Sequence, residues 1–78
     1  YFDSTVEEIH GLNELLFKTK KFLKNQFDPD GFNVGINCGQ SAGQTVMHMH
    51  IHLIPRYKGD VEHPAGGIRG VIPSMQKY

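Results

Sequence analysis

The residues most able to do chemistry in this 78-residue sequence are three histidines that alternate with apolar residues: His48, His50 and His52. On a β-strand successive side chains point to opposite faces, and same-face neighbours are about 6.6–6.8 Å apart. The three imidazoles would then form a row about 13 Å long on one strand face. Met49 and Ile51, which separate them, would anchor the opposite face in the protein interior.

Three interpretations of this row are open. The plainest is a solvent-facing surface without chemistry, although strict alternation of an uncommon residue is hard to explain as filler. The second is metal binding, since two histidines spaced two apart on a strand can share a zinc ion. The other possible ligands are few: Cys38, Asp60, Glu62 and His63. The third is catalysis on a phosphate, because a neutral imidazole can attack through Nε2 while its neighbours donate hydrogen bonds.

The loop before the histidines favours the third interpretation. Gly39 and Gly43 allow backbone N–H groups to turn inward and form an anion-binding nest. Gln44 and Thr45 add side-chain donors at the entrance to the histidine row. Alone this loop is a weak signal, because it lacks the Lys-Ser/Thr end of a P-loop. Beside the histidines it combines a nucleophile with oxyanion donors, which nucleotidyl transfer requires.

Periodicity predicts the elements that must position these groups. Apolar residues at helical intervals, from Ile9 to Leu23, follow two overlapping capping-box spacings. These are Ser4 to Glu7 and Thr5 to Glu8. Asp28-Pro29-Asp30-Gly31 is a turn signature, so we expect a helix over about residues 4–27.

Period-2 alternation predicts two strands, over about residues 32–37 and 44–54. We expect Pro55 to end the second strand and residues 55–78, rich in Gly and Pro, to form an irregular tail. A helix followed by an antiparallel pair is an α+β arrangement. Two strands and one helix rarely stand alone, so we expect the chain to be incomplete as a domain.

The composition limits the classes of partner that we expect this chain to bind. Eight basic and eight acidic residues balance, so no global field recruits a nucleic acid polymer or a membrane. The apolar runs are too short for a transmembrane helix, and the amino end does not resemble a signal peptide. Cys38 is the only cysteine, which excludes an internal disulfide and favours a reducing, cytoplasmic setting.

From residue 43 to residue 54, the sequence GQTVMHMHIHLI resembles the histidine triad (HIT) superfamily, whose hallmark is His-φ-His-φ-His-φ-φ with φ apolar. Asn37 and Pro55-Arg56 extend the match, and the preceding helix fits as well. The chain is similar to the C-terminal portion of members that resemble diadenosine tetraphosphate hydrolases. The resemblance implies a HIT-like antiparallel sheet with a packed helix, usually in a homodimer. It also implies that residues 1–78 are one partial domain lacking the family's N-terminal strands.

The resemblance also implies roles for the predicted catalytic residues. His50 matches the nucleophile, which forms a covalent nucleotidyl-imidazole later hydrolysed by water. His52 matches the histidine that contacts the α-phosphate, and His48 matches the first member of the triad, which supports the nucleophile's surroundings. No metal and no cofactor is implied.

The substrate-binding residues implied by the resemblance are Asn37, Gly43, Gln44 and Thr45. We therefore expect a nucleotide hydrolase or transferase acting at the α-phosphate, with dinucleoside polyphosphates as the best-matched substrates. A nucleoside phosphoramidase of the same superfamily is the nearest alternative. A metal-binding module and a non-catalytic nucleotide-binding module are the other two.

Overall fold

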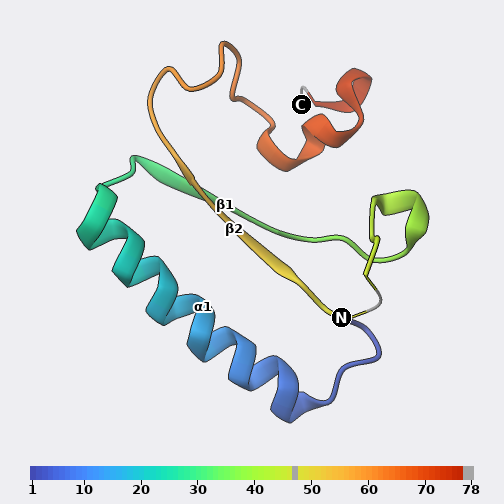
Figure 1. Ribbon diagram of the computed structural model, residues 1–78. Helices are drawn as coiled ribbons and strands as arrows, with labels where there is room; N and C mark the ends of the chain where they lie inside the picture. The colour runs from blue at the N-terminus through green and yellow to red at the C-terminus, as the bar shows by residue number, and fades with distance from the viewer. Residues whose placement is uncertain (47, 77–78) are drawn as a thin grey trace.

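The computed structural model describes residues 1–46 and 48–76 (Figure 1). Its elements are, in order, helix α1 (Val6–Phe27), strand β1 (Gly31–Ile36), 3₁₀ helix η1 (Gln40–Ala42), strand β2 (Ile51–Arg56), and 3₁₀ helices η2 (Gly67–Val71) and η3 (Pro73–Met75). One long helix and an antiparallel strand pair confirm the predicted α+β fold. None of the helices in the described part of the chain is long and apolar enough to cross a membrane.

Helix α1 begins at Val6 because Thr5 caps it. The Glu8 N–H donates to Thr5 Oγ1 at 3.1 Å, and the Thr5 N–H donates to Glu8 Oε1 at 2.8 Å. Of the two overlapping capping boxes, the fold uses this one, so the predicted start at residue 4 was too early. The Ser4 hydroxyl lies instead 3.7 Å from Met49 Sδ.

The β1–β2 pair carries the histidine segment. Its register places Ile36 opposite Ile51 and Gly35 opposite His52. Along β2 burial alternates, with Ile51 and Leu53 half-buried and His52 exposed between them. This agrees with the alternation predicted for these positions.

Both predicted strands have other bounds in the structure. The first was expected over 32–37 and spans Gly31–Ile36, and the second was expected over 44–54 and spans Ile51–Arg56. β2 begins only where β1 offers a hydrogen-bonding partner, so residues 44–46 and 48–50 are not in a strand. Met47, also inside the predicted strand, lies outside the described residues. Pro55 does not end β2, because a proline without an N–H is tolerated on an edge strand.

The two faces of the pair have different covers. Side chains of α1 meet Ile51 and Leu53 around a shallow hollow on one face. On the opposite face, the position that a Cβ on Gly35 would take lies 3.6 Å from Ile68 Cδ1 of η2. Figure 1 shows the same order, with α1 on one side of the strands and the carboxyl-terminal segment on the other. The predicted irregular tail, 55–78, was therefore too simple over its described part, residues 55–76, because it begins inside β2 and contains η2 and η3.

A polar cluster joins this segment to the sheet. The Arg56 guanidinium donates to both carboxylate oxygens of Asp60, at 2.8 and 2.9 Å, and also to Asn33 Oδ1. The Tyr57 N–H donates to Asp60 as well, at 3.0 Å. The hydrogen bonds from Arg56, followed by the one from Tyr57, hold the pKa of Asp60 well below its usual range. Asp60 thus fixes the turn that leads the chain away from β2.

Much of the apolar surface of α1 is exposed. Leu15, Phe17 and Phe22 are 60, 73 and 58% exposed. Among the described residues no hydrophobic side chain other than Pro29 is fully buried. The apolar stripe that predicts the helix is therefore only partly covered by β2.

Candidate functional site

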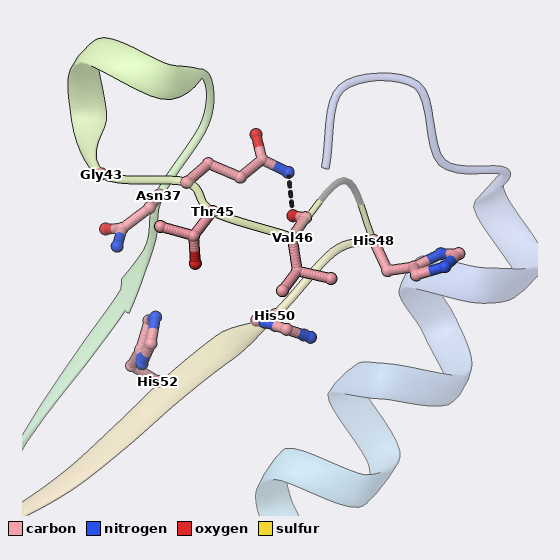
Figure 2. Close-up of a pocket in the computed structure, with 8 residues that line it drawn as sticks. Asn37, Gly43, Thr45, Val46, His48, His50 and His52 are labelled. Atoms are coloured by element: carbon pink, nitrogen blue, oxygen red, sulfur yellow. Dashed lines mark hydrogen bonds between the residues drawn. The ribbon is translucent and has the colours of Figure 1, made fainter.

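A pocket lies where the loop after β1 meets the histidine segment (Figure 2). Its lining consists of Asn37, Gly43, Gln44, Thr45, Val46, His48, His50 and His52. The structure thus brings together every site residue predicted from the sequence. Val46 is the one lining residue that sequence reasoning missed, and only its place between Thr45 and the histidines could have indicated it.

The three histidines reach the pocket from different backbone settings. His52 lies in β2 and is held by the ladder to β1, whereas His48 and His50 precede the strand. All three side chains are exposed, and Met49 and Ile51 between them are half-buried, as the alternation predicts.

The predicted straight row on one strand is nevertheless wrong. In Figure 2 the His48 ring is directed toward α1, whereas the His52 ring is directed toward Asn37. A regular row needs a continuous ladder, and the ladder starts only at Ile51. His48 is consequently the outermost of the three imidazoles, and His50 lies between it and His52.

The loop that precedes them is a tight turn with its own hydrogen bonds. The Ala42 and Gln44 N–H groups both donate to the Gly39 carbonyl at 3.1 Å, and the Gly43 N–H donates to the Gln40 carbonyl at 2.9 Å. Gly39 and Gly43 have φ of 92° and 91°, a region that favours glycine.

The anion-binding nest expected at Gly39 and Gly43 is not formed by the N–H groups of these two glycines. The Gly43 N–H serves the turn, and the Gly39 N–H donates to Gln44 Oε1 at 2.7 Å. Neither group is available to an anion in this structure. The same tight turn that favours glycine at these positions therefore also engages the N–H groups of both glycines in hydrogen bonds.

Thr45 and Asn37 are the polar side chains left open to a ligand. Neither makes a hydrogen bond to another residue that the structure describes, and both are exposed. Figure 2 shows the Thr45 hydroxyl directed into the space bordered by His50 and His52. Asn37 Nδ2 lies 3.6 Å from the position that a Cβ on Gly43 would take, so the loop folds closely over the end of β1.

Among the residues that the structure describes, the titratable side chains that line the pocket are the three histidines. No carboxylate of the described residues enters the lining, so no negatively charged side chain among them repels a phosphate there. Within residues 1–46 and 48–76, no three His, Cys, Asp or Glu side chains lie close enough together to hold a metal ion. Asp60, one ligand considered for such a site, is bound instead by Arg56.

Comparison with known proteins gives one family. Residues 1–59 match the HIT domain family. The chain is 43% identical over 80 residues to the AP-4-A phosphorylase of Mycobacterium tuberculosis, an alignment covering 92% of this chain and 40% of that protein. It is 43% identical over 56 residues to the bis(5'-adenosyl)-triphosphatase of Saccharomyces cerevisiae, covering 72% of this chain and 27% of that protein. The chain thus spans well under half of the length of these curated relatives.

Proposed function

This chain belongs to the HIT domain family, and from that premise we propose that its protein cleaves dinucleoside polyphosphates at the α-phosphate. One observation carries the proposal, namely that a single pocket is lined by all three histidines together with Thr45 and Asn37. The names of its relatives, AP-4-A phosphorylase and bis(5'-adenosyl)-triphosphatase, support the same substrate class.

In the proposed reaction His50 is the nucleophile. The Nε2 lone pair attacks the α-phosphorus, and the bond from that phosphorus to the bridging oxygen breaks with its electron pair on the leaving polyphosphate. A nucleotidyl-imidazole results. Water then attacks the same phosphorus, the N–P bond breaks, and AMP leaves. Diadenosine tetraphosphate would thus give AMP and ATP.

The other lining residues take supporting roles in this proposal. His52 contacts the α-phosphate, and its place in the β2 ladder gives it a fixed position. Thr45 donates a hydrogen bond from its hydroxyl to an oxygen of the phosphate or leaving group. Asn37 binds the substrate on the β1 side, and Gly43 lets the loop approach the substrate. His48, the outermost ring, supports the surroundings of His50.

Inorganic phosphate is a second candidate acceptor in place of water. The observation that favours it is the similarity to an AP-4-A phosphorylase over 92% of this chain. Phosphate attack on the same intermediate would release ADP instead of AMP. A nucleoside phosphoramidase would share the attack by His50 and differ only in its leaving group, an amine.

We further propose a homodimer in which α1 is part of the interface. Phe17 and Phe22 expose apolar surface on the helix, where a second copy would cover them. The first turn carries Glu7 and Glu8 and the last turn carries Lys24, so antiparallel helices would place opposite charges together.

A reducing, cytoplasmic compartment suits Cys38, which is a free and exposed thiol.

The test is product analysis with the intact protein. Diadenosine tetraphosphate, bis(5'-adenosyl) triphosphate and adenosine phosphoramidate are each incubated with and without inorganic phosphate, and the nucleotides are separated by chromatography. AMP and ATP from the tetraphosphate support hydrolysis, whereas ADP that appears only with phosphate supports phosphorolysis. His50→Ala should lower turnover by about 10³-fold or more.

His63→Ala is the matched control, because His63 is exposed and lies outside the pocket lining. It should retain wild-type turnover. Calorimetric binding of a nucleotide without turnover of any of the three substrates would overturn the enzymatic proposal in favour of a non-catalytic binding module.

A further inference from the structure

Gln44 connects the two ends of the loop that forms one wall of the pocket. Its Oε1 accepts the Gly39 N–H at 2.7 Å. Its Nε2 donates to the Val46 carbonyl at 3.0 Å, the dashed line in Figure 2. Its own N–H donates to the Gly39 carbonyl at 3.1 Å. One residue therefore binds both the start of the loop and the segment that leads into the histidines.

The burial of Gln44 is consistent with this internal role. Gln44 is half-buried, whereas Gly43, Thr45 and Val46 around it are exposed. Both heteroatoms of its amide are engaged with the backbone, which leaves one amide N–H and one lone pair of Oε1 for any external partner. A side chain whose main purpose was to bind substrate would leave its amide open, as Asn37 does.

Thr45 is the residue that this arrangement controls. It stands between Gln44 and Val46, whose carbonyl the Gln44 amide binds. Thr45 itself has no hydrogen bond to any other described residue, so its backbone is held only through its two neighbours. The Gln44 bridge therefore binds the backbone on the far side of Thr45, whose hydroxyl is directed toward the space bordered by His50 and His52.

We propose that Gln44 is a positioning residue that fixes the Thr45 hydroxyl relative to His50. This rests on the proposed function, in which Thr45 donates to the phosphate or leaving group. A displacement of about 1 Å in such a donor can cost up to about 100-fold in turnover. The Gln44 amide would then act on kcat through Thr45 and only weakly on substrate affinity.

The experiment compares Gln44→Met with Gln40→Met in the intact protein. Methionine matches glutamine in length but makes neither hydrogen bond. Gln40 is in the same loop, is exposed, and lies outside the pocket lining. With diadenosine tetraphosphate as substrate, Gln44→Met should lower kcat roughly 10- to 100-fold with KM within about threefold of wild type, and Gln40→Met should behave as wild type.

A double-mutant cycle with Thr45→Val separates positioning from direct contact. If Gln44 acts through Thr45, then Thr45→Val causes little further loss in the Gln44→Met background. If the fold losses in kcat of the two single variants multiply in the double variant, the proposal is overturned. A wild-type kcat in Gln44→Met would also overturn it.

Amide hydrogen exchange gives a readout independent of turnover. Exchange at the Gly39 N–H should accelerate in Gln44→Met and stay slow in Gln44→Glu, whose carboxylate still accepts that bond. Unchanged exchange in Gln44→Met would contradict the bridge. Failure of the proposed function itself would appear separately, because the His50→Ala variant would then turn over the substrate as fast as the wild type.

Discussion

Gly35 stands directly opposite His52 in the strand pair, and the position that its Cβ would take lies 3.6 Å from Ile68 Cδ1. Residues directly opposite each other in an antiparallel pair project on the same face. The segment that contains Ile68 therefore covers the face that presents His52. Glycine at 35 leaves room for the Ile68 side chain on this face.

A larger residue at 35 should disturb this arrangement. Gly35→Ala adds only an ordinary contact with Ile68 and should keep kcat within about twofold of wild type. Gly35→Leu places a larger side chain against Ile68 on the face that presents His52, and we expect kcat to fall roughly 10-fold or more. Steady-state kinetics check this, with Gly31→Leu as control, since a Cβ at Gly31 meets no atom within 4 Å. Equal activities of the two leucine variants would contradict the proposed crowding.

Removal of the Thr45 hydroxyl should lower turnover with little change in fold. Thr45→Val keeps the shape of the side chain and removes its only polar atom, so we expect a loss of about 10²-fold in kcat. Thr19→Val is the control, because the Thr19 hydroxyl donates to the Leu15 carbonyl on α1, away from the site. If both variants turn over as wild type, the hydroxyl does not contact the reacting phosphate.

The ion pair between Arg56 and Asp60 should make stability depend on pH in the acid range. The folded protein lowers the pKa of Asp60 below its unfolded value of about 3.9, so the unfolded state takes up its proton first. The stabilisation is complete above about pH 5 and declines as the pH falls below about 4.

Asp60→Asn should therefore lower the midpoint of thermal unfolding at pH 7, and the difference from wild type should narrow toward pH 3. Thermal unfolding followed by circular dichroism at several pH values measures this. Asp3→Asn, at an exposed residue near the amino end, should leave the midpoint unchanged. A difference for Asp60→Asn that stays constant from pH 7 to pH 3 would show that the carboxylate charge is not responsible.

Two glycines allow backbone strain to be separated from steric collision. Gly59 and Gly66 have φ of 82° and 91°, so alanine is strained at both by about 1–2 kcal/mol. Only at Gly66 would the Cβ also collide with a backbone carbonyl, that of Gln76. We expect Gly66→Ala to increase proteolysis of the segment after residue 60 more than Gly59→Ala does. Equal cleavage of the two variants would mean that Gln76 does not pack there.

Local signals in the sequence predicted much of this arrangement. Helical spacing and the turn at residues 28–31 placed α1, and alternation correctly assigned Ile51 and Leu53 to one face and His52 to the other. These features depend on neighbours a few positions apart. The predicted site residues line one pocket, as expected from a histidine pattern and a glycine-bounded loop that lie close together in the chain.

The errors arose where distant or competing contacts decide the structure. β2 starts at Ile51 because β1 ends opposite it, which no pattern within the second segment reveals. The sequence contains two capping-box spacings. In the structure Thr5 caps α1, whereas the Ser4 hydroxyl is directed toward Met49. An anion-binding nest was predicted around Gly39 and Gly43, but the N–H groups of both glycines donate inside the loop, that of Gly39 to the Gln44 side chain.

Covalent catalysis by His50 is the central claim, and trapping of the intermediate tests it most directly. Diadenosine tetraphosphate labelled at the α-phosphate is mixed with the intact protein, quenched within milliseconds, and the protein is digested for mass spectrometry. We expect label that is unstable in acid, stable in base and located on the peptide containing His50, and we expect none in His50→Ala. Label that accumulates equally in His50→Ala, or turnover by wild type with no labelled protein at any time, would contradict the account.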